Sequence, residues 1–229
     1  MKKTTENSLE RLKGLIFQKE IGTVYEKLSR IKTLAQFIVK ENNLPCDINK
    51  INKIVDLSKT DLVSEMVFEY PELQGIMGRI YAAASGQPED VAQTVEQHYW
   101  PLSASGKLPE TIQSAVISLS DKIDTVCADF AIGLEPSGSA DPYGLRRMTI
   151  GIIRMITDFI PNANVERIID ESLKNMPEKI KQLETFKNSK ERIIKFLWNR
   201  IENIYENDGY KFDEVKSVIL PAQKNGFNG

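Results

Sequence analysis

The sequence predicts an all-α fold, a multi-helix bundle with additional helices toward the C-terminal end. Apolar residues recur three and four positions apart along most of the chain, which is the spacing of a helix with one buried face. Proline, glycine, asparagine and serine interrupt this pattern at intervals typical of helix ends. No run alternates apolar and polar residues with a period of two, so no β-strand is predicted.

The predicted helices follow one another in short segments. The apolar pattern begins over residues 12–19, resumes after Gly22 over residues 24–38, and ends at Asn42–Pro45. Further helices are predicted over residues 48–57, 59–70, 71–85, 88–100, 109–132 and 142–159, with three or four shorter ones between residues 164 and 220. Pro71, Pro109 and Pro142 suit the first helical position, where a backbone N–H has no intrahelical partner. The segment 109–132 has the longest apolar face and is predicted to be the central core helix.

Composition limits the class of protein. With 229 residues, 41% of them hydrophobic and 27% charged, the chain can form one large or two small globular domains. Pro161 suggests a division into residues 1–160 and a helical extension over residues 161–229. The formal charge of −2 argues against a protein that is basic throughout, so a nucleic-acid contact would need a local patch.

Cysteine usage and hydropathy predict the compartment. Cys46 and Cys127 are isolated in the sequence, which suits a reducing environment and argues against a disulfide or zinc framework. Polar residues follow the N-terminal lysines where a signal peptide would be apolar, and no run approaches the roughly 18 apolar residues of a membrane span. The expected location is the cytoplasm, with no membrane partner.

No catalytic constellation is visible. His98 is the only histidine, so the chain cannot build the metal site of phosphohydrolases that need one histidine, a His-Asp pair and a distant aspartate. A structural role for His98, capping the carbonyls at a helix end, is favoured over a functional one. We therefore expect no catalytic residue and no metal ligand in this chain.

Two further segments each allow a structural and a functional interpretation. Asp121 and Asp124 lie three residues apart on one helix face, where carboxylates can hold a metal, but structural ion pairs are favoured. Gln74, Gly75 and Gly78 lack the spacing of a phosphate-binding loop and fall inside a helical pattern. Glycine in a helix costs about 1 kcal/mol relative to alanine, so close packing and the approach of another chain are equally supported.

The segment from Ser137 to Arg147 could recognise phosphate. A flexible loop leads into a helix at Asp141–Pro142, and Arg146 and Arg147 follow within about one turn, so amide donors and guanidinium groups could converge on an anion. In the competing interpretation Asp141 caps the helix and an arginine pairs with a carboxylate, such as Asp121, Asp124 or Glu65. Five residues are candidates for a positive face: Lys59, Arg79, Arg146, Arg147 and Arg154.

Several ordered motifs resemble one known family. They are the block Lys59–Arg79, the turn Glu96–Pro101, the segment Asp121–Thr125 and the run Asp141–Arg147, which reads Asp-Pro-x-x-Leu-Arg-Arg. Together they resemble the central region of the β subunit of the bacterial two-subunit glycyl-tRNA synthetase, from about Leu12 to Ile156. The matched residues that we assign to structural motifs are Asp61, Glu65, Gln74, Gly75, Gly78, His98, Asp121, Asp124, Asp141 and Pro142.

The resemblance implies a fold, partners and a division of labour. The matching region of the family has an HD-like fold, and a lone His98 with Asp121 is what a catalytically empty relative would contain. In that family the α subunit activates glycine with ATP and Mg²⁺, while the β subunit recognises tRNA. This chain is therefore expected to contact glycine-specific tRNA and the α subunit, to bind no cofactor itself, and not to act on DNA.

Three departures from the family pattern bear on this expectation. Ala140 stands where the family commonly has lysine, and Gly144 where it has alanine, which would weaken a phosphate contact at this loop. The chain is also much shorter than a whole β subunit and is expected to be a piece of one, leading toward the anticodon-binding region. The alternative is an HD-type helical scaffold that joins domains or subunits without touching RNA.

Overall fold

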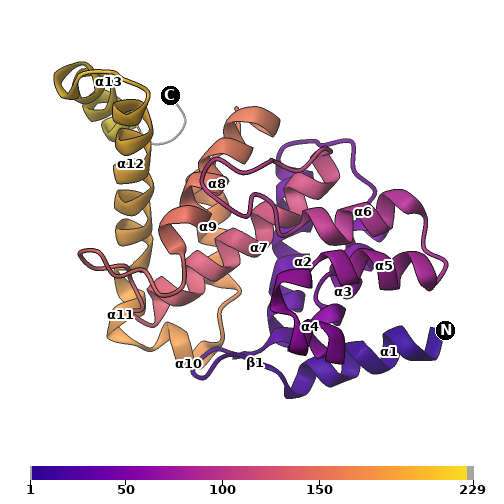
Figure 1. The fold of residues 1–229 in the computed structure, drawn as a ribbon. Helices are drawn as coiled ribbons and strands as arrows, with labels where there is room; N and C mark the ends of the chain where they lie inside the picture. The colour runs from indigo at the N-terminus through magenta and orange to yellow at the C-terminus, as the bar shows by residue number, and fades with distance from the viewer. Residues whose placement is uncertain (1, 226–229) are drawn as a thin grey trace.

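A single long helix, α7 (Ile112–Ala131), runs through the middle of the protein (Figure 1). In this computed structural model, which describes residues 2–225, every residue from Ser114 to Ala131 is buried. Helices α2, α6, α8, α9 and α12 pack around it, which explains how a helix can be buried on all sides. The prediction of a central core helix is confirmed. It begins at Ile112 rather than Pro109, because the Thr111 side chain accepts a hydrogen bond from the Ser114 amide and caps it.

The described chain is all-α apart from one small hairpin, and 69% of it is helical. The remaining α-helices are α1 (Lys2–Arg11), α2 (Val24–Glu41), α3 (Ile48–Ser58), α4 (Glu65–Glu69), α5 (Ile76–Ala84), α6 (Glu89–Gln97), α8 (Leu145–Phe159), α9 (Val165–Lys174), α10 (Glu178–Lys181), α11 (Glu184–Lys187), α12 (Ser189–Asn207) and α13 (Phe212–Asn225). Short 3₁₀ helices are η1 (Leu12–Gly14), η2 (Thr60–Val63) and η3 (Pro71–Leu73). After residue 164 the described chain thus forms five α-helices, where the sequence predicts three or four.

The predicted helix over residues 12–19 is wrong, as is the expectation that the chain has no strand. After η1 the chain forms an antiparallel hairpin of β1 (Ile16–Gln18) and β2 (Gly22–Thr23). Gly22 has a φ of 132°, a conformation that glycine adopts readily. Thr23 and Glu26 then form a capping box that starts α2.

The segments predicted as helices over residues 59–70 and 71–85 are each broken. Residues 60–69 form η2 and α4, because the Ser64 side chain caps α4 by accepting a hydrogen bond from the Val67 amide. Pro71 begins only η3, and Gly75, with a φ of 85°, interrupts the chain before α5. The Gly75 amide donates to the carboxylate of Asp61 at 2.7 Å, so this break is held by a buried side chain.

Helix α8 also begins later than predicted. Its first residue is Leu145 rather than Pro142, and Gly144, with a φ of 68°, precedes it. The Asp141 carboxylate accepts hydrogen bonds from the amides of Leu145 and Arg146 at 2.8 and 3.0 Å. Asp141 thus accepts hydrogen bonds from first-turn amides, as a capping side chain does, but the N-cap residue is Gly144 and Pro142 lies before the helix instead of at its first position.

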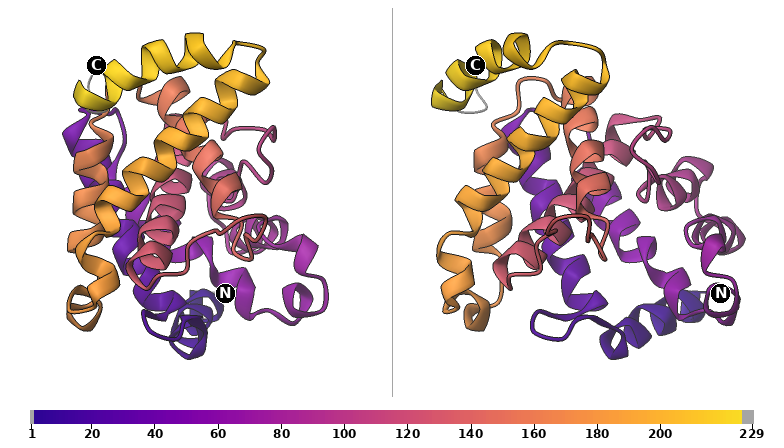
Figure 2. Two further views of the ribbon diagram at one scale, coloured as in Figure 1. Left: turned by 90° about the vertical axis from the view of Figure 1, so that its left-hand side faces the viewer. Right: turned by 60° about the vertical axis from the view of Figure 1, so that its left-hand side comes forward.

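The main hydrophobic core extends from Leu12 to Leu197. Residues of α9 and α12 belong to it, whereas Val215 and Ile219 of α13 pack with Trp198 in a small separate cluster. Figure 2 shows α12 crossing the bundle and α13 projecting at its end. The division near residue 160 and the likeness to HD-type folds stay predictions.

Cys46 and Cys127 are both free thiols. Cys127 is buried on α7, and burial raises its pKa to about 12. Among the described residues, no helix has the length and hydropathy needed to cross a bilayer.

Candidate functional site

The most unusual feature of the core is a cluster of buried charges where α2, α3 and α7 meet. Lys27, Lys59 and Lys122 are only 4 to 6% exposed, and Asp121 and Asp124 are similarly buried. Charged side chains are rarely so buried unless they are paired. The pairing of each charge therefore decides what the cluster can bind.

Asp124 is fully paired. The Arg30 guanidinium donates to both of its carboxylate oxygens, from Nε at 2.7 Å and from Nη2 at 3.1 Å, and the Lys27 ammonium donates to Oδ2 at 2.9 Å. Burial alone would raise the pKa of Asp124, but Lys27 and Arg30 outweigh it and lower that pKa. The predicted structural ion pairs are confirmed here, with partners on α2.

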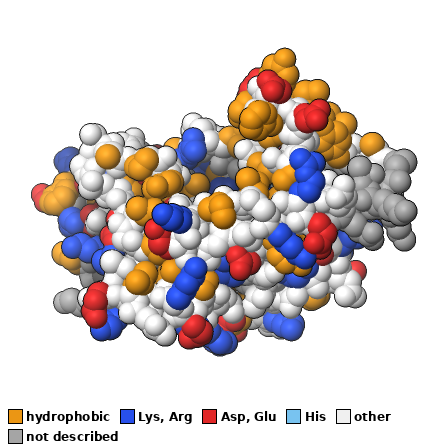
Figure 3. Space-filling model, turned by 90° about the horizontal axis from the view of Figure 1, so that it is seen from below, with side chains coloured by type: hydrophobic (Ala, Val, Ile, Leu, Met, Phe, Trp, Pro, Cys, Tyr) orange, Lys and Arg blue, Asp and Glu red, His pale blue; other side chains and the backbone are white. Residues whose placement is uncertain are grey.

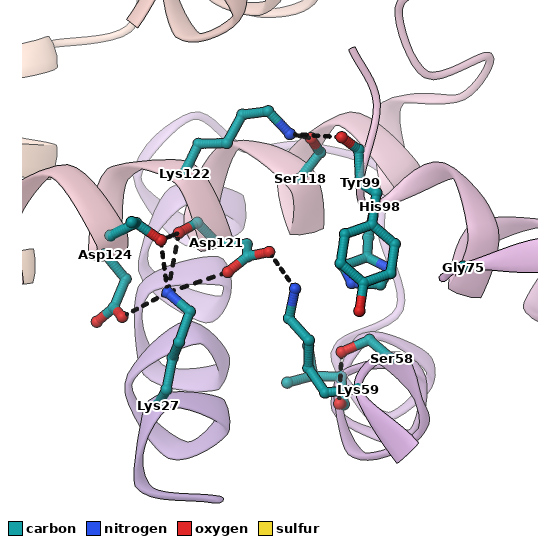
Figure 4. Close-up of polar contacts among 12 residues, drawn as sticks. Lys27, Ser58, Lys59, Gly75, His98, Tyr99, Ser118, Asp121, Lys122 and Asp124 are labelled. Carbon is teal, nitrogen blue, oxygen red and sulfur yellow. Dashed lines mark hydrogen bonds and ion pairs between the residues drawn. The ribbon is translucent and has the colours of Figure 1, made fainter. Parts of the chain in front are cut away.

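Asp121 lies between two ammonium groups, as Figure 4 shows. Lys27 Nζ is 3.0 Å from Oδ1 and Lys59 Nζ is 2.5 Å from Oδ2. Burial alone would raise the pKa of Asp121, but these two lysines outweigh it and lower that pKa. Neither predicted arginine pairs with Asp121 or Asp124, so that part of the competing interpretation is wrong.

Lys122 points away from both carboxylates. Its ammonium donates to the backbone carbonyls of Tyr99 and Trp100 and to the Ser118 hydroxyl, at 2.9 to 3.0 Å (Figure 4). All three acceptors are neutral. Burial, with the nearby charges of Lys59 and Arg147, lowers the pKa of Lys122 to about 7 although Asp121 opposes the shift.

A pocket of about 370 Å³ opens beside this cluster. Its polar lining comes from Lys27, Lys59, Gln74, Tyr99, Asp121, Lys122, Thr125 and Arg147, and its apolar lining includes Phe17, Leu62, Leu102 and Met148. Four of these residues carry basic side chains and one carries a carboxylate. The pocket is thus mainly cationic, with apolar side chains in part of its lining, and we call it the cationic pocket.

His98 has the structural position that the sequence predicts. It ends α6, and its Nδ1 lies 2.6 Å from the carbonyl oxygen of Val95. Burial and the charge of Lys59 lower its pKa well below the usual value, so the ring is neutral and Nδ1 donates this hydrogen bond. Its Nε2 is buried with no partner among the described residues.

The Gln74–Gly78 segment serves close packing. A Cβ on Gly78 would lie 2.9 Å from Val95 and 3.2 Å from the Asp61 carboxylate, and one on Gly75 would lie 2.8 Å from the Tyr99 ring. Gly78 lies inside α5, where close packing accounts for it. The prediction that Gln74 and Gly75 lie inside a helix is wrong, because α5 begins at Ile76 and Gly75 has a positive φ. Glu65, by contrast, is exposed at the start of α4.

The five candidates for a positive face are not gathered on one surface. Arg79 pairs with Glu89 and Glu96, Arg154 donates to the carbonyls of Ala104 and Gly106, and Arg146 donates to those of Gly138 and Ala140. Lys59 and Arg147 both line the cationic pocket. Arg147 is exposed, and its guanidinium has no hydrogen bond or ion pair within residues 2–225. Figure 3 shows lysine and arginine side chains interspersed with acidic ones over the face seen from below.

Sequence reasoning missed the partners of the two aspartates. Lys27 and Arg30 lie on the same helix as the buried residues Val24, Leu28 and Ile31, and a charged residue on an apolar face is a signal for a buried ion pair. That signal was available in the sequence. What it could not show is that α7 presents both carboxylates to this face.

Ammonium and guanidinium groups occupy the positions beside the Asp121 and Asp124 carboxylates that a metal ion would need. Among residues 2–225, no group of three histidine, cysteine or acidic side chains lies close enough to hold a metal ion. The Lys59 ammonium on Asp121 and the Lys27 ammonium between Asp121 and Asp124 use the oxygens that a cation would need. The charges of the cluster thus pair with one another, and its carboxylate oxygens are used by cationic side chains.

A second surface feature is apolar. Six large hydrophobic side chains of the α4–α5 region are exposed, with Phe68 at 80%; the others are Met66, Tyr70, Ile76, Ile80 and Tyr81. Hydrophobic side chains also gather on a projecting part of the face in Figure 3. Exposed apolar groups of this size and number are typical of interaction surfaces.

Comparison with known proteins places this architecture in a family. The family model described as "Glycyl-tRNA synthetase beta subunit" matches residues 1–220. Relatives named glycine–tRNA ligase beta subunit are 36% identical in Syntrophus aciditrophicus, over 93% of this chain, and 38% identical in Trichlorobacter lovleyi, also over 93% of this chain. In Desulfatibacillum aliphaticivorans the identity is 34% over 95% of this chain.

The match covers nearly the whole of this chain but a smaller part of each relative. In all three cases it spans 31% of the relative's length. A family model that covers residues 1–220, together with these identities, is sufficient to assign the family. The chain belongs to the glycyl-tRNA synthetase β subunit family.

Proposed function

We propose that this chain contributes a tRNA contact to a glycine–tRNA ligase whose separate α subunit activates glycine with ATP and Mg²⁺. The family assignment supports the reaction and the partner, since the relatives are named as β subunits of this ligase. In this proposal the chain itself binds neither ATP nor metal and acts in the cytoplasm.

One observation carries the proposed RNA contact. Arg147 presents an exposed guanidinium in the first turn of α8, with no ion pair among the described residues. The two hydrogen bonds from Arg146 to the carbonyls of Gly138 and Ala140 hold the preceding loop against the same turn. An unpaired guanidinium on a fixed turn is suited to a phosphate of the RNA backbone.

Binding of glycine tRNA across a salt series tests this contact. We expect the logarithm of the association constant to fall linearly with the logarithm of salt concentration, by roughly 0.7 to 0.9 per phosphate neutralised. Arg147→Gln removes about one phosphate contact, so it should reduce the magnitude of that slope by roughly 0.7 to 0.9 and weaken binding at low salt. Fluorescence anisotropy with a labelled tRNA measures both quantities, and a non-cognate tRNA shows how much of the binding is specific.

Arg11→Gln is the matched control, because Arg11 is also an exposed arginine but lies at the end of α1. Equal slopes for the parent chain and Arg147→Gln would remove Arg147 from the RNA surface. No binding at low salt by the folded chain would contradict the RNA contact altogether.

The exposed apolar surface favours a second function, that of a scaffold joining domains or subunits. Such a surface would associate with another part of the ligase through burial of hydrophobic area, which salt weakens little. We expect Phe68→Ser to weaken association with the α subunit, measured by co-elution at high salt. Val218→Ser, at a position that is 70% exposed on α13, serves as the control, and equal co-elution of the two variants would count against the scaffold.

A further inference from the structure

The cationic pocket contains donors that the protein itself does not use. Lys59 is 6% exposed, and its ammonium makes a single hydrogen bond among the described residues, to Asp121 Oδ2 at 2.5 Å. It also lies 4.0 Å from the centre of the Tyr99 ring. A lysine ammonium has three N–H donors, so at least one remains without a protein partner. Buried donors are almost always satisfied, and an exception calls for an explanation.

The neighbouring groups show which kind of acceptor would fit. Lys27 has no spare donor, because its ammonium contacts both Asp121 and Asp124 as well as the Thr125 hydroxyl. It nevertheless adds positive charge beside Lys59. Both oxygens of Asp121 face an ammonium group, so the one carboxylate in the pocket lining is already compensated.

Two more basic groups of the pocket lining add positive charge near Lys59 and Lys27. Lys122 and the unpaired Arg147 also line the pocket. Burial, together with the charges of Lys59, Arg147 and Lys27, lowers the pKa of Lys122 to about 7. These cations repel one another at close range, and an anion placed among them would relieve that repulsion.

The volume of the pocket and its apolar lining residues limit the size and chemistry of the ligand. A volume of about 370 Å³ is at the lower end of the range for small-molecule sites, which is roughly 300 to 1,000 Å³. Apolar side chains such as Phe17 and Leu102 stand beside the basic ones. A ligand with an anionic end and a compact, less polar body matches both parts.

We propose that this pocket binds the phosphate group of a small phosphorylated molecule, no larger than a mononucleotide, with the Lys59 ammonium as its principal donor. The exposed Arg147 donates to the same phosphate group, and Lys27 and Lys122 add positive charge near it. The proposal shares Arg147 with the RNA contact, but its principal donor is the buried Lys59. Loss of phosphate binding in Lys59→Met, with tRNA binding unchanged, therefore separates the two proposals.

Isothermal titration calorimetry of the full chain with inorganic phosphate, AMP and adenosine tests the proposal. We expect saturable binding of phosphate or AMP and none of adenosine, which lacks the anion. Lys59→Met should weaken binding by more than roughly tenfold, as expected for a charge-assisted hydrogen bond. Lys53→Met, which changes an exposed lysine on α3, should leave it unchanged.

A second variant guards against a folding defect in Lys59→Met. Arg147 is exposed and unpaired among the described residues, so Arg147→Gln should retain the fold while weakening binding roughly three- to tenfold. AMP binding more tightly than phosphate would identify a nucleotide, whereas equal affinities would identify the oxyanion itself. Absence of saturable binding, equal binding of adenosine, or full affinity in both variants would overturn the proposal.

Discussion

Replacing Asp124 with alanine is expected to destabilise the protein by about 3 to 5 kcal/mol. The change leaves the charge of Arg30 without its carboxylate inside the core and removes one of the two carboxylates that contact Lys27. Removing one partner of a buried ion pair costs far more than the pair contributes, because the remaining charge stays desolvated. Urea denaturation followed by circular dichroism gives the free energy of unfolding for the parent and the variant.

Asp56→Ala provides the matched control. Asp56 pairs with Lys32 at 2.6 Å, but its side chain is 41% exposed, and exposed pairs contribute only about 0 to 1 kcal/mol. The double change Asp124→Leu with Arg30→Met should recover much of the lost stability, because it removes the unpaired charge of Arg30. A loss for Asp124→Ala no larger than that for Asp56→Ala would show that the buried cluster does not behave as one charge network.

Asp129→Asn is expected to stabilise the protein at pH 7 to 8, by roughly 2 to 3 kcal/mol from the pKa difference. Asp129 is buried on α7, where it accepts one hydrogen bond from Gln18 at 2.9 Å and its Oδ2 has no partner among the described residues. Burial raises its pKa from 3.8 to about 6. Above pH 6 the folded protein must therefore hold a buried carboxylate with little compensation, and asparagine removes that charge.

The sign of the pH dependence follows from the raised pKa. Between about pH 6 and pH 4 the folded state binds more protons at Asp129 than the unfolded state does, so this residue stabilises the fold as the pH falls. The advantage of Asp129→Asn should be largest above pH 7 and should shrink steadily toward pH 4.5. Asp121 and Asp124, whose pKa values are lowered, act in the opposite direction, but they are present in both proteins and cancel in the difference.

Thermal unfolding at several pH values, with denaturant titrations at pH 8 and pH 5, measures this effect. Asp158→Asn is the control, because Asp158 is exposed on α8 and its replacement should change little at either pH. A stability difference for Asp129→Asn that stays constant from pH 8 to pH 5 would show that Asp129 is not protonated in this range.

Much of the fold was predictable because it follows from local patterns. The apolar spacing of α7 is a property of consecutive residues, and so is the capping of α8 by Asp141. The errors occurred where a local signal competes with the periodicity. Residues 12–19 show a helical pattern, but Gly22 and the capping box at Thr23 favour a hairpin that leads into α2.

The candidate site was predictable only in part. The sequence indicates that Asp121 and Asp124 share a helix face and that His98 ends a helix. It offers Lys59 and four arginines as candidates for a positive face without showing that they converge. The structure buries Lys59 and gives Arg79, Arg146 and Arg154 partners of their own. Charge type can be read from a sequence, but whether a charge is free depends on neighbours that are distant along the chain.

The sequence by itself determined the helical class, the central helix and the family, because each rests on residue order alone. Only the tertiary structure decided that Lys27 and Lys59 meet at Asp121, since the three residues come from three segments that packing brings together. It also decided which basic groups remain unpaired. The desolvation of a charged side chain and its pairing with other charges depend on the assembled core. They determine that these residues form a cationic pocket.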